Sequence, residues 1–295
     1  MSFEPAAVNP IDPPFAVIAP PQQTAAVVYA SPHSGNRYPP GFVTGSRLDP
    51  LTLRRSEDAF VDELFAGAPE RGAPLLKAFF PRAYIDPNRE PWELDPTMFA
   101  DALPSYVNGA SPRVSAGLGT IARVVANGAE IYRGKLSFAD ARLRIETLYR
   151  PYHEHLQGLI DATYARFGHA LLIDCHSMPS VGGPTDRDAG KRRVDFVLGD
   201  CFGASCAPAV MRETESFLRR QGFAVARNDP YAGGFTTRHY GQPARGRHAL
   251  QIEINRGLYM DELRIERSGG FAALKRALDG LIEALTDIAA ALPRG

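Results

Sequence analysis

Residues 170–176, ALLIDCH, combine a short apolar run with an aspartate, a cysteine and a histidine at its end. A run of this length predicts a buried strand. Alternation along that strand places Cys175 on the opposite face from Asp174 and His176. We therefore expect Cys175 to lie in the core, which disfavours a Cys–His nucleophile, and we expect His176 to follow the strand directly.

Four other runs are of the same kind and alternate with helical patterns. They cover residues 24–30 (TAAVVYA), 194–198 (VDFVL), 223–226 (FAVA) and 249–254 (ALQIEI), and weaker runs near 83–86 and 121–125 predict additional strands. Strands that alternate with helices indicate an α/β sheet covered on both faces. Such folds collect their chemistry at the carboxyl ends of the strands, so the polar residues after these runs are the candidate functional residues.

Three segments show apolar residues at helical spacing. Residues 57–66 predict a helix with Ser56 as its N-cap. Residues 137–165 predict a second helical segment, which Pro151 should kink or divide. Residues 271–291 predict an amphipathic helix that packs on the sheet.

The composition is that of an ordinary globular protein, with 295 residues, of which 44% are hydrophobic and 22% charged. We find no internal repeat and no composition break that would mark a linker. We therefore expect one domain over residues 24–295. Residues 1–23 are Pro-rich and predict a surface arm.

Charge and hydropathy exclude several classes of partner. Basic and acidic residues number 33 each, so no net charge attracts nucleic acid or anionic lipid. No apolar run approaches the roughly 20 residues that span a bilayer, and the N-terminal residues lack the pattern of a signal peptide. Three cysteines, an odd and sparse set, suit a reducing compartment. We expect a cytoplasmic protein without nucleic-acid or membrane partners.

His33 and His176 share one sequence context, because each follows an apolar run and precedes Ser and a turn with Pro or Gly. Imidazole is the commonest metal ligand, and a catalytic zinc site has three protein ligands and one open position. Glu57 and Asp58 follow the first strand, and either could supply a carboxylate. A single histidine at a strand end is more often a hydrogen-bonded surface residue. Two in matching contexts favour a shared metal site.

Glu253 lies inside the apolar run LQIEIN, where alternation separates it from Ile252 and Ile254. A carboxylate in a buried strand needs a partner or a function. Two interpretations stay open on these grounds: an ion pair with Arg256 or another arginine, and a catalytic carboxylate.

Five segments, found in one order along most of the chain, resemble the N-formylglutamate amidohydrolase family. They are SPHSGNRYP (31–39), RAYIDPNRE (82–90), DCHSMPS (174–180), NDPYAGGFTTRHYGQP (228–243) and LQIEINRGLYMDE (250–262). The family is similar to the zinc carboxypeptidases and aspartoacylases. The resemblance implies a single-domain, three-layer α/β/α fold with a mixed central sheet, and catalytic function for residues 24–295.

The resemblance also implies a mononuclear zinc site held by His33, His176 and an acidic residue. In carboxypeptidases the acidic ligand lies three residues after the first histidine, but Asn36 occupies that position here. The SEDAFVDELF segment resembles the acidic segment of the family. Its alignment favours Asp58 as the third ligand, with Glu57 as the reserve.

Roles for the surrounding residues follow from the same resemblance. Glu253 would be the general base and acid. Asn88 and Arg89 resemble the Asn–Arg pair that holds a substrate carboxylate, and a guanidinium suits this because it binds a carboxylate in a bidentate manner. Alternatively, Arg89 pairs with Asp86 or Glu90.

Two more arginines are candidates for substrate binding. Arg238, in a glycine-rich segment, would bind the second carboxylate of an acidic substrate, although a solvated loop arginine is nearly as good an interpretation. Arg144 is a further candidate within the helical segment. Weaker candidates are Arg82, His153, His239 and Tyr259.

These roles predict zinc-dependent hydrolysis of an N-acyl acidic amino acid, above all N-formyl-L-glutamate to formate and L-glutamate. Two alternatives stay open: a deacylase for another N-acyl amino acid, and a metal-containing protein that binds a small molecule without turnover. The GxGxxA pattern at residues 117–122 does not follow a strand, and no GxSxG elbow is present. Dinucleotide binding and serine-hydrolase chemistry are therefore disfavoured.

Overall fold

One mixed sheet organises the chain in a computed structural model, which describes residues 11–126, 128–184 and 186–293. The strand order is β1-β3-β2-β4-β7-β5-β6. The central strands β3, β2, β4 and β7 are parallel, whereas β1 is antiparallel to β3 and β5 is antiparallel to β7. The strands are β1 Phe15–Ile18, β2 Val27–Ser31, β3 Leu75–Ala78, β4 Ala170–Met178, β5 Phe196–Gly199, β6 Val225–Arg227 and β7 Arg247–Asn255, with a separate hairpin of β8 Met260–Asp261 and β9 Glu266–Arg267.

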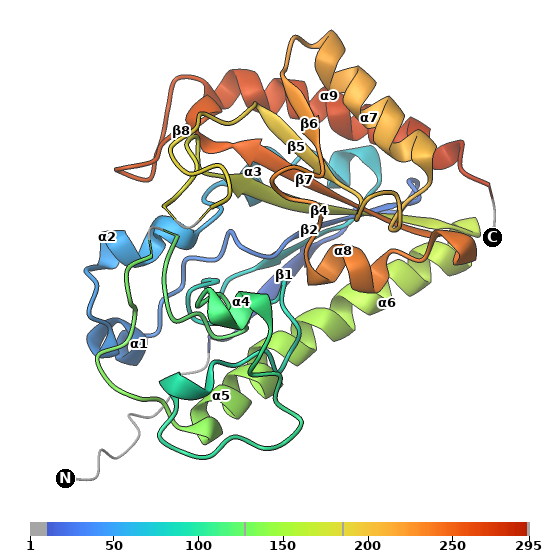
Figure 1. The fold of residues 1–295 in the computed structure, drawn as a ribbon. Coiled ribbons are helices and arrows are strands. Elements are labelled where there is room, and N and C mark those ends of the chain that lie inside the picture. Colours follow the sequence, from blue (N-terminus) through green and yellow to red (C-terminus); the bar gives the residue numbers. More distant parts are fainter. Residues whose placement is uncertain (1–10, 127, 185, 294–295) are drawn as a thin grey trace.

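Helices cover both faces of this sheet (Figure 1). The longer α-helices are α5 Phe138–Arg144, α6 Arg150–Phe167, α7 Pro208–Arg220 and α9 Phe271–Ala290, and the short ones are α1 Pro40–Gly45, α2 Pro50–Leu53, α3 Val61–Leu64, α4 Pro112–Ser115 and α8 Phe235–Tyr240. Single 3₁₀ turns are η1 Arg54–Ser56, η2 Pro69–Arg71, η3 Pro96–Met98, η5 Pro243–Arg245 and η6 Arg256–Leu258, and η4 Ile145–Tyr149 is a π turn. Helices α3, α7 and α9 pack on one face, and α6 and α8 on the other. The predicted three-layer arrangement with a mixed sheet is confirmed.

The two faces of β4 show why the apolar runs become central strands. All nine residues of β4 are buried, as expected for a parallel strand covered on both sides. Ile173 and Cys175 pack in the core below α9, whereas Leu172 packs in the core below α6. The prediction that Cys175 is a core residue is confirmed. Within the described ranges, no helix is long and apolar enough to cross a membrane.

The helical segment around Pro151 is divided by a π turn. Helix α5 starts after Ser137, whose hydroxyl accepts a hydrogen bond from the Asp140 amide. The π turn η4 then separates α5 from α6, and Pro151 lies in the first turn of α6. Proline lacks the N–H donor and its ring crowds the carbonyl four residues back, so the wider turn accommodates it. The predicted interruption is confirmed.

Several predicted elements differ from the structure at the sheet edge. Residues 15–18, assigned to the surface arm, instead form β1, and residues 1–10 of that arm lie outside the described residues. Strand β3 was not predicted, because its sequence LLKA is short and poor in β-branched residues. The segments 83–86 and 121–125 form turns and an isolated bridge rather than strands.

The predicted helix over residues 57–66 is also wrong at its start. Phe60 has a left-handed backbone with φ of 66°, which a helix cannot continue through, so α3 begins only at Val61. Ser56 does not cap α3, and its hydroxyl accepts a hydrogen bond from the Ala126 amide instead. As a result, Asp58 lies in a loop, and its amide donates to the carbonyl oxygen of His33.

Candidate metal and substrate site

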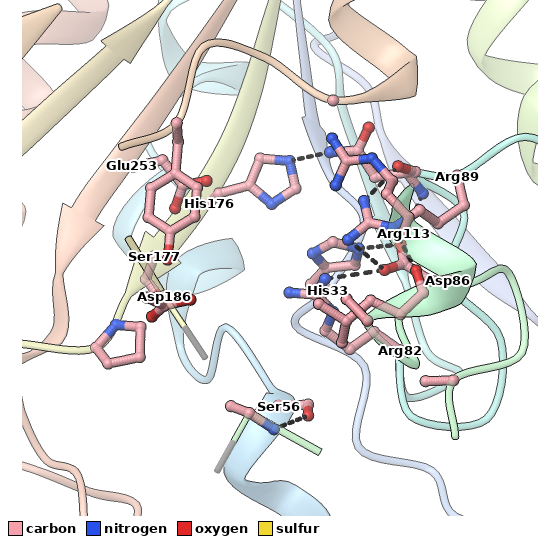
Figure 2. Close-up of a pocket in the computed structure, with 18 of the residues that line it drawn as sticks. His33, Ser56, Arg82, Asp86, Arg89, Arg113, His176, Ser177, Asp186 and Glu253 are labelled. Carbon is pink, nitrogen blue, oxygen red and sulfur yellow. Dashed lines mark hydrogen bonds and ion pairs between the residues drawn. The ribbon is translucent and has the colours of Figure 1, made fainter. Parts of the chain in front are cut away.

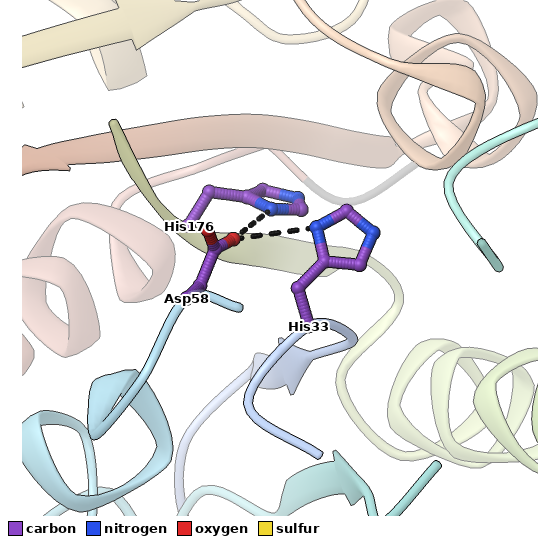
Figure 3. Close-up of side chains that lie close together, drawn as sticks. All are labelled: His33, Asp58 and His176. Carbon is purple, nitrogen blue, oxygen red and sulfur yellow. Dashed lines mark hydrogen bonds and ion pairs between the residues drawn. The ribbon is translucent and has the colours of Figure 1, made fainter. Parts of the chain in front are cut away.

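Three buried side chains converge at the carboxyl ends of β2 and β4 (Figure 3). His33 follows β2, Asp58 lies in the loop before α3, and His176 lies within β4 rather than after it. Strands β2 and β4 are paired neighbours, so their ends bring both imidazoles to one place. The left-handed backbone at Phe60 keeps Asp58 out of the helix and free to face them.

These three side chains could hold one metal ion, and two of their three ligand-to-ligand distances match tetrahedral coordination. The Asp58 Oδ2 atom lies 3.0 Å from Nδ1 of His176 and 3.3 Å from Nδ1 of His33. Two ligands of a tetrahedral ion with bonds of about 2.0 Å are about 3.3 Å apart. One donor atom from each of the three residues lies within 4.8 Å of the other two. Two imidazoles and one carboxylate are the donor set of a catalytic zinc site.

Neighbouring groups direct the Asp58 carboxylate toward the histidines. Its Oδ1 atom accepts hydrogen bonds from Nη2 of Arg256 at 3.0 Å and from the Ser177 hydroxyl at 3.3 Å. Burial disfavours a charged carboxylate, but the hydrogen bonds from His176 and His33 outweigh it and hold the pKa of Asp58 well below its usual range. The carboxylate is therefore ionised and presents Oδ2 to the cluster.

A second carboxylate sets the tautomer of His33. Nε2 of His33 lies 2.7 Å from Oδ1 of Asp86, and Oδ2 of Asp86 accepts from Nη2 of Arg82 at 2.9 Å. Burial opposes ionisation of Asp86, but the charges of His33, Arg82 and Arg89 hold its pKa well below normal. With Nε2 held by Asp86, a metal ion at Nδ1 would take the place of the proton that faces Asp58 in this arrangement.

Two polar groups lie behind His176. Its Nε2 atom is 3.0 Å from Oδ1 of Asp174 and 3.1 Å from Nδ2 of Asn88. Asp174 points to the same side of β4 as His176, as strand alternation predicts. Burial lowers the pKa of His176, but the charge of Asp174 outweighs this and raises it well above normal. Nδ1 of His176 donates to Oδ2 of Asp58 in this arrangement, and a metal ion at Nδ1 would take the place of that proton.

The cluster opens on a cavity of about 340 Å³ (Figure 2). His33 and His176 line it, together with Glu253 of β7 and the segment 230–234. Its charged lining consists of Arg82, Asp86, Arg89, Arg113, Asp186, Glu253 and Arg256. A volume of this size holds a small molecule of amino-acid dimensions.

Glu253 faces this cavity without an ion-pair partner in the described part of the chain. Its backbone pairs with that of His176 on the neighbouring strand, and its Oε1 accepts a hydrogen bond from Nε2 of Gln251 at 2.9 Å. Arg256, the partner considered from sequence, bonds to Asp58 instead. Burial raises the pKa of Glu253 to about 7. A carboxylate with this pKa can accept and return a proton near neutral pH.

Asn88 and Arg89 line the cavity, and both are held firmly. Oδ1 of Asn88 accepts from the Thr236 amide at 2.9 Å. Nε and Nη1 of Arg89 donate to the carbonyl oxygens of Leu118 and Asn88 at 2.8 and 2.7 Å. Nη2 of Arg89 lies 3.7 Å from Oδ2 of Asp86 and makes no hydrogen bond to the described residues. Burial lowers the pKa of Arg89 to about 10, so the group is still cationic at neutral pH.

Two predicted substrate-binding arginines do not line the cavity. Arg144 is buried elsewhere: its guanidinium stacks 3.9 Å from the Tyr84 ring centre and donates to the Tyr84 carbonyl, the Tyr132 hydroxyl and Asp140. The donors of Arg144 therefore serve the fold, and the structure does not bring Arg144 to the cavity. Arg238 is exposed on α8 and is also absent from the lining.

The reserve ligand Glu57 also lies outside the cluster. Its Oε1 accepts from the Tyr38 hydroxyl at 2.8 Å and from Nε of Arg54 at 3.0 Å, so it is bound on the far side of the loop. Its neighbour Asp58 faces His33 and His176 instead, because adjacent residues in this extended loop point in different directions.

Of the weaker candidates for site residues, Arg82 lies in the cavity lining and the others lie outside it. Arg82 lines the cavity, where burial opposes its charge but Asp86, Asp58 and Glu253 raise its pKa. His153 is largely buried against Tyr240, and its Nε2 donates to the Pro87 carbonyl at 2.8 Å, so it supports the segment that carries Asn88. Neither His239, which stacks on Phe235, nor the buried Tyr259 lines the cavity.

Sequence reasoning missed Arg113, Tyr231 and the role of Arg256. Arg113 lies in the four-residue helix α4, far from the recognised segments, and no pattern marks it. Tyr231 lies within NDPYAGGFTTRHYGQP, so that segment was the available signal. Arg256 was considered only as a partner of Glu253.

The model of the N-formylglutamate amidohydrolase family matches residues 25–260. N-formylglutamate deformylases from Pseudomonas aeruginosa and Pseudomonas putida are 32% and 30% identical to this chain, each over 80% of it and 82% of the relative. The crystal structure of N-formylglutamate amidohydrolase from Ralstonia eutropha JMP134 superposes with a TM-score of 0.84 at 38% identity, covering 93% of this chain and 97% of the other. This chain therefore belongs to the N-formylglutamate amidohydrolase family.

Proposed function

We propose that this protein hydrolyses the amide bond of an N-acyl acidic amino acid, above all N-formyl-L-glutamate, and releases formate and L-glutamate. The names of the relatives support this substrate. The observation that carries the proposal is the arrangement of His33, Asp58 and His176 beside Glu253 on one cavity. In metal-assisted amide hydrolysis, three ligands hold the ion and an unligated carboxylate moves the proton.

His33 and His176 would hold a zinc ion through Nδ1, and Asp58 through Oδ2. Zinc bound there supplies Lewis-acid chemistry, which lowers the pKa of water and polarises the acyl oxygen. Asp86 would keep the proton of His33 on Nε2, Asp174 lies 3.0 Å from Nε2 of His176, and Arg256 holds Oδ1 of Asp58 so that Oδ2 faces the histidines. These outer groups pre-organise the ligands.

Glu253 would move the proton. Its Oε1 is engaged by Gln251, so Oε2 is the atom available to take a proton from the attacking water. The protonated carboxyl would then deliver that proton to the leaving amine nitrogen. A pKa of about 7 suits both steps, because neither protonation state is strongly favoured near neutral pH.

Arginines would position the substrate and stabilise developing charge. Nη2 of Arg89 is free of hydrogen bonds to the described residues and would bind the α-carboxylate. Arg82 lies close enough to Asp58 and Glu253 for their charges to act on it, and it lines the cavity. Its guanidinium would stabilise the oxyanion that forms at the acyl carbon.

Formate release and zinc content test this proposal together. We expect one zinc ion per chain, hydrolysis of N-formyl-L-glutamate, and loss of at least about 100-fold in kcat for Glu253→Gln with zinc retained. Glu213→Gln, an exposed substitution on α7, is the matched control and should behave as wild type. Undiminished turnover by Glu253→Gln would remove the proposed base. Faster hydrolysis of the N-acetyl than of the N-formyl substrate would show that acetyl is the preferred acyl group.

A further inference from the structure

Three arginines share one wall of the cavity with a single carboxylate. Figure 2 shows Arg82, Arg89 and Arg113 grouped around Asp86, across the cavity from Glu253. Asp86 is already bound to His33 through Oδ1 and to Arg82 through Oδ2. The charge of Glu93 also acts on Arg89 and Arg113, but Glu93 does not line the cavity. Three guanidinium groups against these two carboxylates leave this wall with an excess of positive charge.

Arg113 is the member of this group without a partner. Arg82 donates to Asp86, and Arg89 donates to two carbonyl oxygens. Arg113 makes no hydrogen bond or ion pair with any residue that the structure describes, although it is only partly exposed. Burial, and next the charge of Arg238, lower the pKa of its guanidinium. A cation in such a position is unfavourable unless an anion binds to it.

The backbone holds Arg113 beside Arg89. Ser111 caps α4 by accepting a hydrogen bond from the Val114 amide, and Val114 is buried. A few residues later, the Leu118 carbonyl accepts from Nε of Arg89 at 2.8 Å. The segment that carries Arg113 is therefore anchored at both ends, and its position is part of the site.

We propose that Arg113 binds the side-chain carboxylate of the substrate and restricts the enzyme to substrates with two carboxylates; this rests on the proposed function. The α-carboxylate shares a carbon atom with the scissile amide nitrogen, so it must lie nearest the metal ligands. Arg89 is linked to them through Asp86. The side-chain carboxylate lies farther along the substrate, and Arg113 contacts no metal ligand. A guanidinium at that distance offers the paired donors that a carboxylate requires.

This proposal assigns binding of the second carboxylate, predicted for Arg238, to Arg113 instead. Arg238 is exposed and does not line the cavity, whereas its charge acts on Arg113. It would contribute to the positive potential at the cavity without contacting the bound substrate. Replacing it should therefore leave the choice between charged and neutral side chains unchanged.

Turnover of an isosteric pair of substrates tests the assignment. The measurement is kcat/KM for N-formyl-L-glutamate and for N-formyl-L-glutamine, with wild type, Arg113→Gln, Arg113→Lys and the exposed control Arg212→Gln. We expect Arg113→Gln to lose on the order of 10–100-fold with the glutamate substrate and less than about 3-fold with the glutamine substrate. Arg113→Lys should retain part of the preference. Equal losses on both substrates, or none, would overturn the proposal.

Product binding separates this proposal from the proposed function. Calorimetric affinities for L-glutamate and L-glutamine do not depend on turnover. Wild type should prefer L-glutamate, and Arg113→Gln should not. If wild type released no formate, the proposed function would fail, and the binding preference would still decide the role of Arg113. An unchanged preference in Arg113→Gln and Arg113→Lys would sink the inference whatever the turnover.

Discussion

Nε2 of His33 lies 2.7 Å from Oδ1 of Asp86, and this contact joins the cluster of His33, Asp58 and His176 to the arginine-lined wall of the cavity. Asp86 orients His33, binds Arg82 and accepts the Asn88 amide hydrogen bond. One carboxylate thus fixes His33, a proposed metal ligand, and the segment that carries Arg89. Changes at Asp86 should therefore affect metal binding and substrate binding together.

Asp86→Ala tests the first of these effects. Loss of the Asp86 carboxylate frees the tautomer and the ring of His33, so we expect the zinc dissociation constant to rise by about 10–100-fold. Competition with a chromophoric chelator measures it, and the exposed substitution Asp161→Ala is the control. Zinc affinity unchanged in Asp86→Ala would show that Asp86 does not support His33.

Glu253→Gln should stabilise the metal-free protein at alkaline pH. The carboxyl titrates near pH 4.5 in a free chain and near pH 7 in the folded protein. Between these values the folded state binds more protons than the unfolded state, so the Glu253 carboxylate lowers the free energy of unfolding as pH rises. The uncharged amide removes this cost, which reaches about 3 kcal/mol above pH 7.

Urea unfolding of the zinc-free protein at pH 5 and pH 8 measures this difference. We expect similar stability of wild type and Glu253→Gln at pH 5 and a more stable variant at pH 8. A variant that is equally stable at both pH values would mean that Glu253 titrates normally. Loss of turnover together with a gain in stability would identify Glu253 as a residue kept for function.

Arg144 and Arg89 should respond differently to the same substitution. Arg144→Met removes donors from the Tyr84 carbonyl and leaves Asp140 without its partner, so we expect a loss of about 2–4 kcal/mol in unfolding free energy. KM of the folded variant should be unchanged. Arg89→Met should instead raise KM for N-formyl-L-glutamate. A raised KM in Arg144→Met would contradict the placement of Arg144 away from the substrate.

The strand pattern predicted the part of the site that depends on the sheet. His33 and His176 were identified because apolar runs end near them, and paired parallel strands bring such ends together. Glu253 was noticed because a carboxylate interrupts an apolar strand. Each of these signals lies in one short segment, and strand pairing in the sheet brings the segments close together.

The remaining site residues and the short strands are placed by loop geometry and tertiary packing. The acidic stretch before Val61 predicts a helix, but the left-handed backbone at Phe60 prevents it. The periodicity of apolar residues does not indicate which residue adopts a left-handed backbone. Arg144 lies in a helical pattern that cannot reveal which neighbours its guanidinium meets. The position of Arg113 depends on the short helix α4 and on the hydrogen bond that the Leu118 carbonyl accepts from Arg89. Both depend on contacts between different segments of the chain. Strands β1 and β3 have four residues each, which is too short for a periodic signal.

Anomalous diffraction at the zinc edge, from crystals of the active protein, tests the central claim most directly. One peak per chain should lie between Nδ1 of His33, Nδ1 of His176 and Oδ2 of Asp58. Full activity in crystals with no peak at that position, or with the ion held by other residues, would contradict it.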